Sequence, residues 1–109
     1  SSAWYNVGAP SVGIGMLNGY MSYTETCIFI KEGARRYFDN YFQVPFCVRD
    51  SDWVSYDDVQ SIRLKAEWIR DMQVAGVMTW SLNMDDWPGL CAGKRFELHN
   101  LIKNIIRDQ

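Results

Sequence analysis

An acidic and aromatic loop holds the residues of this chain that are best suited to chemistry. Trp80 comes first, the adjacent carboxylates Asp85 and Asp86 follow, and Trp87 ends the group. An indole near solvent has a flat apolar face that can stack on a sugar ring or a base. A core tryptophan followed by a turn is the alternative interpretation, because large aromatic side chains are mostly buried. The exposure of Trp80 therefore decides between a stacking site and a packing role.

A strand is the element that must position Trp80, and it is expected at residues 77–82. Val77 and Met78 give this strand an apolar start, and Thr79 continues the β-favouring composition. Strands of α/β proteins are apolar on both faces, and the loops at their C-terminal ends carry much of the chemistry. A single buried parallel strand is not stable alone, so it must pair with strands outside this chain. The sequence is therefore interpreted as a fragment.

Helices are expected on both sides of this strand. Asp57 and Asp58 can cap the first helix, because a carboxylate accepts hydrogen bonds from unpaired backbone N–H groups and meets the positive end of the helix dipole. Apolar residues at spacings of three and four then make one stripe, namely Val59, Ile62, Ala66, Ile69 and Met72. Gly76 is expected to end this helix. The second helix begins near Phe96, and its apolar face carries Leu98, Leu101, Ile102, Ile105 and Ile106.

The first half of the chain has the composition of loops and short strands. Glycines are concentrated in residues 1–19, which favours an extended loop. Residues 20–30 are expected to form a strand that runs into a short helical turn. Further short strands are expected at residues 35–39, 42–48 and 53–56, which indicates a small antiparallel sheet. Pro45 should confine its strand to an edge or a bulge, because proline has no N–H to donate.

Composition and charge exclude several classes of protein. The chain has 109 residues, enough for one small domain or part of a larger one, and its 48% hydrophobic and 22% charged residues are typical of globular proteins. Its net charge of −2 gives no support for a nucleic-acid partner, which would call for a basic patch or stripe. No apolar run is long enough to span a membrane. The chain begins at Ser1 without a visible signal peptide, so Ser1 is not expected to be the natural start.

The cysteine count leaves two redox settings open. Cys27, Cys47 and Cys91 have no Cys-x-x-Cys spacing, and His99 is the single histidine, so a zinc site is not expected. One disulfide and one free thiol would fit a secreted protein. Three buried thiols would fit a cytosolic protein, and composition does not choose between the two.

Several segments, taken in order, resemble the patterns of one known family. Residues 19–27, Gly-Tyr-Met-Ser-Tyr-Thr-Glu-Thr-Cys, resemble Gly-x-x-x-Tyr-Tyr-Glu-Ile-Cys, and residues 44–46 resemble Val-Pro-Tyr. Residues 53–58, Trp-Val-Ser-Tyr-Asp-Asp, resemble Trp-Val-Gly-Tyr-Asp-Asp. Residues 76–87 resemble Gly-Ala-Met-Val-Trp-Ala-Leu-Asp-Leu-Asp-Asp-Phe. The chain is identified on these grounds as a C-terminal fragment of a glycoside hydrolase family 18 chitinase or chitinase-like protein.

The resemblance implies an α/β fold that is the C-terminal part of a (β/α)8 TIM barrel with most of the α+β chitinase insertion domain. Residues 1–56 would be the partial insertion domain, and residues 57–109 the last helix-strand-helix of the barrel. Active sites of such barrels lie at the C-terminal ends of the strands. Trp80 would then lie on the floor of the cleft, with its indole against an N-acetylglucosamine ring.

The resemblance also implies a set of site residues. The candidate substrate-binding residues are Trp80, Tyr20, Tyr23, Glu25 and Trp53. Core packing is the alternative for the tyrosines and Trp53. A structural role is the alternative for Glu25 and for Lys65, because an unpaired buried charge is costly. Asp85 and Asp86 are expected to cap or tie down the last loop, and His99 is given no role.

The resemblance further implies that Cys27 and Cys91 form a disulfide, as the matching positions do in many secreted members, and that Cys47 is free. The protein is expected to be extracellular and its parent monomeric. Its partners would be chitin or chitooligosaccharides, with no nucleic acid, membrane, cofactor or metal.

The implied activity is hydrolysis of β-1,4-linked N-acetylglucosamine polymers by substrate-assisted retaining catalysis, in which the N-acetyl group is the nucleophile. The family supplies its general acid from Asp-x-x-Asp-x-Asp-x-Glu, and this chain has no such string. The chain alone is therefore expected to lack hydrolase activity, and to fold poorly because its strand edge is open. The alternatives are a non-catalytic lectin that binds chitooligosaccharides, or a structural or signalling relative without sugar binding. Thr24 and Asn83 depart from the family pattern and favour a divergent or lectin-like member.

Overall fold

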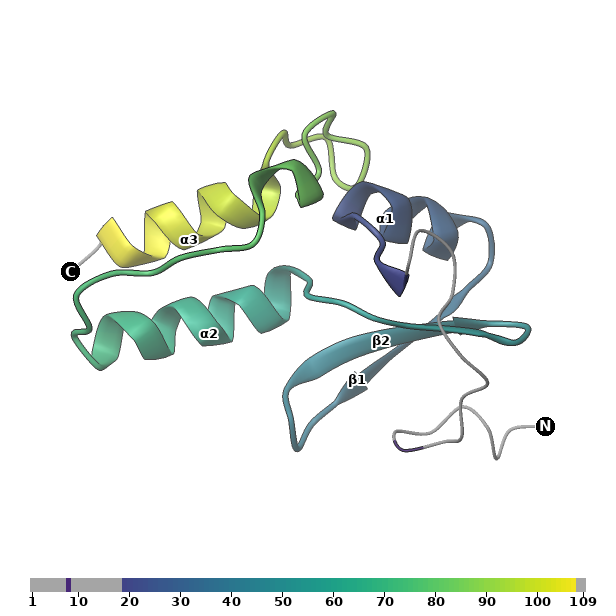
Figure 1. Ribbon diagram of the computed structural model, residues 1–109, viewed down its shortest axis with the longest axis horizontal. Helices are drawn as coiled ribbons and strands as arrows, with labels where there is room; N and C mark the ends of the chain where they lie inside the picture. The colour runs from purple at the N-terminus through teal and green to yellow at the C-terminus, as the bar shows by residue number, and fades with distance from the viewer. Residues whose placement is uncertain (1–7, 9–18, 108–109) are drawn as a thin grey trace.

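The computed structural model describes Gly8 and residues 19–107, and the described part contains helices at both ends of the chain and a small sheet between them. The elements in order are α1 (Tyr23–Lys31), β1 (Arg35–Asp39), β2 (Val44–Arg49), β3 (Asp52–Ser55), α2 (Val59–Asp71), the short 3-10 helix η3 (Leu82–Met84) and α3 (Glu97–Arg107). The sheet and α1 occupy one end of the molecule, and α2 and α3 lie side by side at the other (Figure 1). The loop expected over residues 1–19 lies outside the described residues, apart from Gly8 and Gly19.

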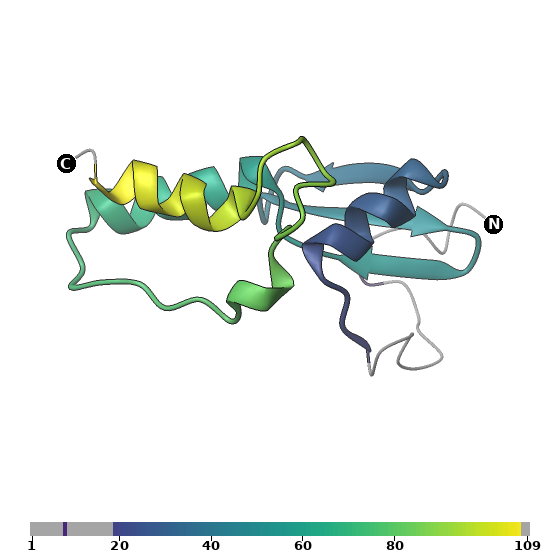
Figure 2. The ribbon, with the colours of Figure 1, turned by 90° about the horizontal axis from the view of Figure 1, so that it is seen from above.

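The three strands form an antiparallel sheet in the order β1-β2-β3, as the sequence predicts. Cys47 in β2 lies opposite Arg36 of β1 and Val54 of β3. Helix α1 crosses one face of this sheet (Figure 2), and the core there is built from Phe29, Ala34 and Cys47. The core of this end is therefore a single helix packed on a single sheet.

Pro45 lies in the central strand, so the expected edge or bulge position is wrong. The register pairs Phe46 with Ser55, the last residue of β3, and this places Pro45 opposite Tyr56. The missing N–H of proline therefore falls where the β3 ladder has already ended. The Pro45 carbonyl still accepts the Tyr56 N–H at 3.3 Å, so the sheet loses little.

The strand expected to begin residues 20–30 is not formed, and in place of the expected short helical turn the chain forms the nine-residue helix α1. The hydroxyl of Ser22 accepts the Glu25 backbone N–H at 3.1 Å and caps the helix. Thr26 and Phe29 are both buried, and their spacing of three puts them on one helical face toward the sheet. The packing of this helical face against the sheet outweighs the β-propensity of its residues, because β-propensity depends strongly on context.

Helix α2 begins as predicted and ends earlier than predicted. The Asp58 carboxylate accepts the Ser61 N–H while the Ser61 hydroxyl accepts the Asp58 N–H, both at 2.9 Å, which makes a capping box. The helix ends at Asp71, and Gln73 then adopts the left-handed conformation at φ 54°. Gly76 therefore does not end the helix, because the chain has already turned at Gln73.

The strand expected at residues 77–82 is not formed, and an extended segment followed by η3 takes its place. This segment runs back in the direction opposite to α2 and α3 (Figure 1). None of the strands in the described residues pairs with it, so its backbone has no ladder to join. The expected burial is also wrong, since residues 71–80 are all exposed. Within the described residues, no helix has the length and apolar character needed to cross a membrane.

Candidate functional site

An open cavity of about 940 Å³ lies between the extended segment and the helices. One wall is the extended segment itself, with Trp80 and Thr79, and the other walls come from α2, the first turns of α3 and the start of α1. Tyr20, Tyr23 and His99 are among the polar or aromatic residues that line it. A concave, mostly apolar surface with a few polar groups has the character of a ligand site.

Trp80 is 89% exposed, which decides against a packing role within the described chain. The Trp80–Ser81 peptide bond is cis. Because the indole is solvent-accessible at the cavity, its flat apolar face is available to a ligand.

Both predicted tyrosines line the same cavity as Trp80. Tyr20 is 73% exposed, so its ring and hydroxyl are accessible to solvent. Burial, together with the negative charge of Glu97, raises the pKa of Tyr23 to about 12. The Tyr23 hydroxyl therefore stays protonated over the physiological range and can donate a hydrogen bond.

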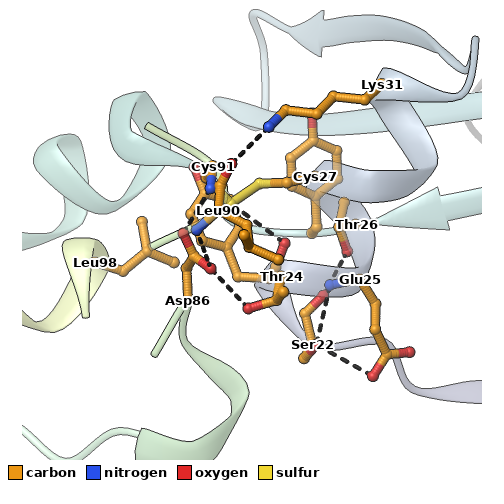
Figure 3. The surroundings of a disulfide bond; sticks show 12 residues. Ser22, Thr24, Glu25, Thr26, Cys27, Lys31, Asp86, Leu90, Cys91 and Leu98 are labelled. Atoms are coloured by element: carbon orange, nitrogen blue, oxygen red, sulfur yellow. Dashed lines mark hydrogen bonds between the residues drawn. A yellow bond between two sulfur atoms is a disulfide. The ribbon is translucent and has the colours of Figure 1, made fainter. Parts of the chain in front are cut away.

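Glu25 and Trp53 do not line this cavity. The Glu25 carboxylate accepts the Ser22 hydroxyl at 3.2 Å in the first turn of α1 (Figure 3). Trp53 lies on β3 and stacks on Phe46, with ring centroids 5.2 Å apart, and Phe46 in turn stacks on Tyr37. Any ligand contact made by Glu25 or Trp53 would therefore belong to a different surface from that of Trp80.

Asp85 is one of the residues that line the cavity, and it fastens the loop after η3 to the start of α3. Its buried carboxylate accepts the backbone N–H groups of Leu98 at 3.3 Å and His99 at 2.8 Å, so it caps α3 from outside the helix. The same carboxylate is 2.8 Å from Nδ1 of His99. The prediction that Asp85 caps or ties down this loop is confirmed. The sequence did not predict the contact between His99 and Asp85, because the two residues are 14 positions apart and nothing in the sequence around His99 indicates its partner.

Asp86 joins the same loop to α1 (Figure 3). Its carboxylate accepts the Thr24 hydroxyl at 2.8 Å, the Leu90 N–H at 3.1 Å and the Cys91 N–H at 2.7 Å. Burial alone would raise the pKa of Asp86, but the hydrogen bonds from Cys91, Thr24 and Leu90 outweigh it and hold the pKa below its ordinary value. The prediction that Asp86 ties down the loop is confirmed as well.

A disulfide joins Cys27 of α1 to Cys91 of the loop before α3, with Cα atoms 5.5 Å apart (Figure 3). This is the pair that the resemblance implied, and Cys47 is a buried free thiol. Nearby, Lys31 Nζ donates to the Leu90 carbonyl at 2.6 Å. The disulfide, Asp86 and Lys31 together fasten the sheet-bearing end to the loop that leads into α3.

Other charged side chains are used in the structure itself. Lys65 pairs with Asp57 at 2.7 Å, in keeping with the structural interpretation of that lysine. Arg36 pairs with Asp58 at 3.2 Å and lines a second, smaller cavity of about 510 Å³ near the disulfide. Among the residues that the structure describes, no group of histidine, cysteine and acidic side chains is arranged to hold a metal ion.

A sequence profile of the glycosyl hydrolases family 18 matches residues 3–85. The chain belongs to this family. Human chitinase-3-like protein 2 is 39% identical over 97 residues, which cover 82% of this chain and 24% of that protein. The chain thus spans about a quarter of the length of this curated relative, and the family assignment rests on that part.

Solved structures of family 18 proteins match nearly the whole chain. Catalytic domain 2 of the Group II chitinase of Ostrinia furnacalis superimposes with a TM-score of 0.90 at 32% identity, covering 99% of this chain and 30% of that one. Human YKL-39, described as a pseudo-chitinase with retained chitooligosaccharide binding properties, superimposes with a TM-score of 0.89 at 34% identity, covering 98% and 31%. A chitinase and a pseudo-chitinase therefore fit this family 18 chain about equally well.

Proposed function

We propose that this chain supplies part of the cleft of a family 18 protein that binds β-1,4-linked N-acetylglucosamine polymers. The observation that carries the proposal is the exposed indole of Trp80 at the edge of a cavity that Tyr20 and Tyr23 also line. The apolar face of a pyranose ring packs on an indole, while tyrosine hydroxyls can hydrogen bond to the sugar hydroxyls at its edge. Trp80 would form the floor of the cleft, and Tyr20 and Tyr23 part of its wall.

The proposed architecture is the last helix-strand-helix of a (β/α)8 barrel over residues 57–109, preceded by part of the insertion domain over residues 1–56. Helices α2 and α3 point the same way, and the extended segment that connects them runs back beside the pair in the opposite direction, as in a β/α repeat (Figures 1 and 2). Val77 and Met78 are 45% and 79% exposed, which suits side chains that other strands would cover. The coverage of about a third of each matched structure agrees with this assignment.

In the enzyme interpretation, the full-length protein cleaves its substrate by the substrate-assisted retaining mechanism. The N-acetyl group attacks the anomeric carbon while an acid protonates the leaving oxygen, and water then opens the cyclic intermediate. This chain has no Asp-x-x-Asp-x-Asp-x-Glu string, so the acid would come from outside it. The contribution of Trp80 would be to hold the sugar in a reactive position.

A non-catalytic chitooligosaccharide-binding lectin is the second candidate function. The observation that favours it is the likeness to human YKL-39, a pseudo-chitinase with retained chitooligosaccharide binding properties. The same indole, tyrosines and cavity would serve both functions, since both need a bound sugar. In either case the protein would act outside the cell, in keeping with its disulfide, because disulfides persist in oxidising compartments.

Binding to chitin beads by the full-length protein tests the shared part of the proposal. We expect retention on the beads and elution by soluble chitooligosaccharide, whereas elution by salt alone or passage through the column would contradict it. Hydrolysis of a chitooligosaccharide then separates the two functions. Chain cleavage, together with the acidic motif in the full-length sequence, selects the enzyme, and retention without cleavage selects the lectin.

A further inference from the structure

His99 is hydrogen bonded through both ring nitrogens to residues that are distant in sequence. Its Nδ1 lies 2.8 Å from an oxygen of Asp85, and its Nε2 lies 2.7 Å from the hydroxyl oxygen of Thr79. Thr79 directly precedes Trp80 in the chain. The imidazole therefore connects the segment that carries the exposed indole to the start of α3.

The Asp85 end of this connection is rigid. The side chain of Asp85 is 0% exposed, and its oxygens also accept the backbone N–H groups of Asp86 at 2.7 Å, Leu98 and His99. A carboxylate held by several backbone donors cannot move without breaking the cap of α3. Asp85 therefore holds the imidazole in a single orientation, as a carboxylate does for the ring of a metal-ligating histidine.

The partners determine which nitrogen carries the proton. An ionised carboxylate only accepts, so Nδ1 carries a hydrogen and donates it to Asp85. In the neutral ring Nε2 is then an acceptor, and the Thr79 hydroxyl donates to it. This assignment follows from the hydrogen-bond network. In the series Thr79–His99–Asp85, the Thr79 hydroxyl thus donates to His99, and His99 donates to Asp85.

The Thr79 end of the connection restrains an otherwise exposed segment. Residues 71–80 are all exposed, and this segment belongs to no strand of the described sheet. Within residues 19–107, the hydroxyl–imidazole contact is the hydrogen bond that ties the segment at Thr79 to α3. Fixing the backbone at Thr79 fixes the point from which the indole of Trp80 projects. A stacking side chain that is fixed beforehand loses less entropy when it binds.

We propose that His99 is a positioning residue, which holds Thr79 against the Asp85-capped start of α3 and so orients Trp80 for carbohydrate binding. This inference deepens the proposed function and rests on it. His99 touches no sugar in this role. It acts through Thr79, and its effect is on how well Trp80 is fixed before the ligand arrives.

Variants of His99 and Thr79 in the full-length protein separate the two hydrogen bonds. His99→Leu removes both bonds. His99→Gln places an amide near the position of Nε2 and can still reach Thr79, and His99→Asn places one near Nδ1 and can still reach Asp85. Thr79→Val keeps the shape of the side chain and removes its hydroxyl. Because Thr79→Val leaves the cap of α3 intact, it keeps the test decisive even if a His99 variant folds poorly.

Two measurements are made on each variant: the dissociation constant for a chitooligosaccharide, and the ¹⁹F NMR line of 5-fluorotryptophan at position 80. We expect binding about three- to tenfold weaker for Thr79→Val and His99→Leu, the range that a single lost hydrogen bond implies. The double variant should be no weaker than His99→Leu alone, because both changes remove the same bond. His99→Gln should recover part of the loss, and the Trp80 line should shift or broaden in Thr79→Val.

A Thr79→Val protein with an unchanged dissociation constant and an unchanged Trp80 line would overturn the inference. Additive losses in the double variant would also overturn it. Measuring Trp80→Ala in parallel distinguishes a failure of the positioning role of His99 from a failure of the proposed function. If Trp80→Ala weakens binding and Thr79→Val does not, the positioning role alone is wrong. If Trp80→Ala binds as the wild type does, the sugar-stacking function is wrong, and the positioning role for carbohydrate binding is wrong with it.

Discussion

The Asp86 carboxylate accepts the hydroxyl hydrogen of Thr24 at 2.8 Å, although 62 residues separate the two in sequence. This contact lies beside the disulfide between Cys27 and Cys91 and joins α1 to the loop that leads into α3 (Figure 3). The loop begins after η3, the short helix that follows the segment carrying Trp80. The structure thus fastens the sheet-bearing end to the candidate sugar site by a buried charge and a covalent bond.

Replacing Asp86 by asparagine should destabilise the full-length protein by about 1.5–3 kcal/mol, the range for hydrogen bonds to a charged group. The amide has one acceptor oxygen, and its NH₂ group faces donors from Thr24, Leu90 and Cys91. Urea unfolding measures the effect. Asp71→Asn is the matched control, because that side chain is 68% exposed and its change should stay within about 0.5 kcal/mol. Equal effects of the two changes would contradict a structural role for Asp86.

The contribution of Asp86 should disappear in acid. Its pKa in the folded protein lies below the ordinary value of 3.8, so the folded state binds the proton less readily than the unfolded state does. Such a group stabilises the protein fully above the unfolded pKa, and the stabilisation is lost as the pH falls through the folded pKa. The difference in urea midpoint between the wild type and Asp86→Asn should therefore be constant near neutral pH and shrink below pH 3.8. A difference that grows in acid would have the wrong sign.

Removing the disulfide should lower the free energy of unfolding, because the unfolded chain gains conformational entropy when the cross-link is lost. The bond spans 64 residues, and the loop-entropy relation gives about 4 kcal/mol for a loop of that size. The Cys27→Ser, Cys91→Ser double variant of the full-length protein should therefore unfold at a lower urea concentration. The reduced wild type is the control and should match the variant. A wild type that is unaffected by reduction would show that the bond is absent in solution.

The thiol of Cys47 should resist alkylation until the protein unfolds. Its side chain is 0% exposed, and burial raises its pKa to about 11, so little thiolate is present at pH 8. Iodoacetamide treatment followed by mass spectrometry should leave the native protein unlabelled at Cys47. The same treatment in urea without reductant should label Cys47 and neither Cys27 nor Cys91. Rapid labelling in the native state would contradict the burial of Cys47.

Local chemistry made part of this fold predictable from sequence. The cap of α2 depends on Asp58, one of the two aspartates expected to cap this helix, and the helix begins directly after it. The sheet also follows from local signals, since short strands were expected at residues 35–39, 42–48 and 53–56, and β1, β2 and β3 form there. The acidic pair Asp85 and Asp86 was expected to fasten the last loop, and it does.

Features that depend on distant partners were not predictable in the same way. Residues 20–30 were expected to form a strand that runs into a short helical turn, because their aromatic and β-branched side chains favour a strand, whereas α1 is helical from Tyr23 to Lys31. The segment before Trp80 was expected to be a buried strand, and it lacks neighbouring strands within the described residues. His99 was given no role, because its bonds to Thr79 and Asp85 arise only when α3 is placed beside the extended segment.

The most direct test of the account is the dissociation constant of a chitooligosaccharide for the full-length protein and its Trp80→Ala variant, measured by titration calorimetry. Loss of an aromatic residue that anchors a ligand typically costs about 2 kcal/mol, so binding should weaken by roughly thirtyfold. Trp68→Ala is the matched control, because Trp68 is 61% exposed on α2 and does not line the cavity, and its variant should bind as the wild type does. An unchanged affinity in Trp80→Ala would contradict the sugar-stacking role of Trp80.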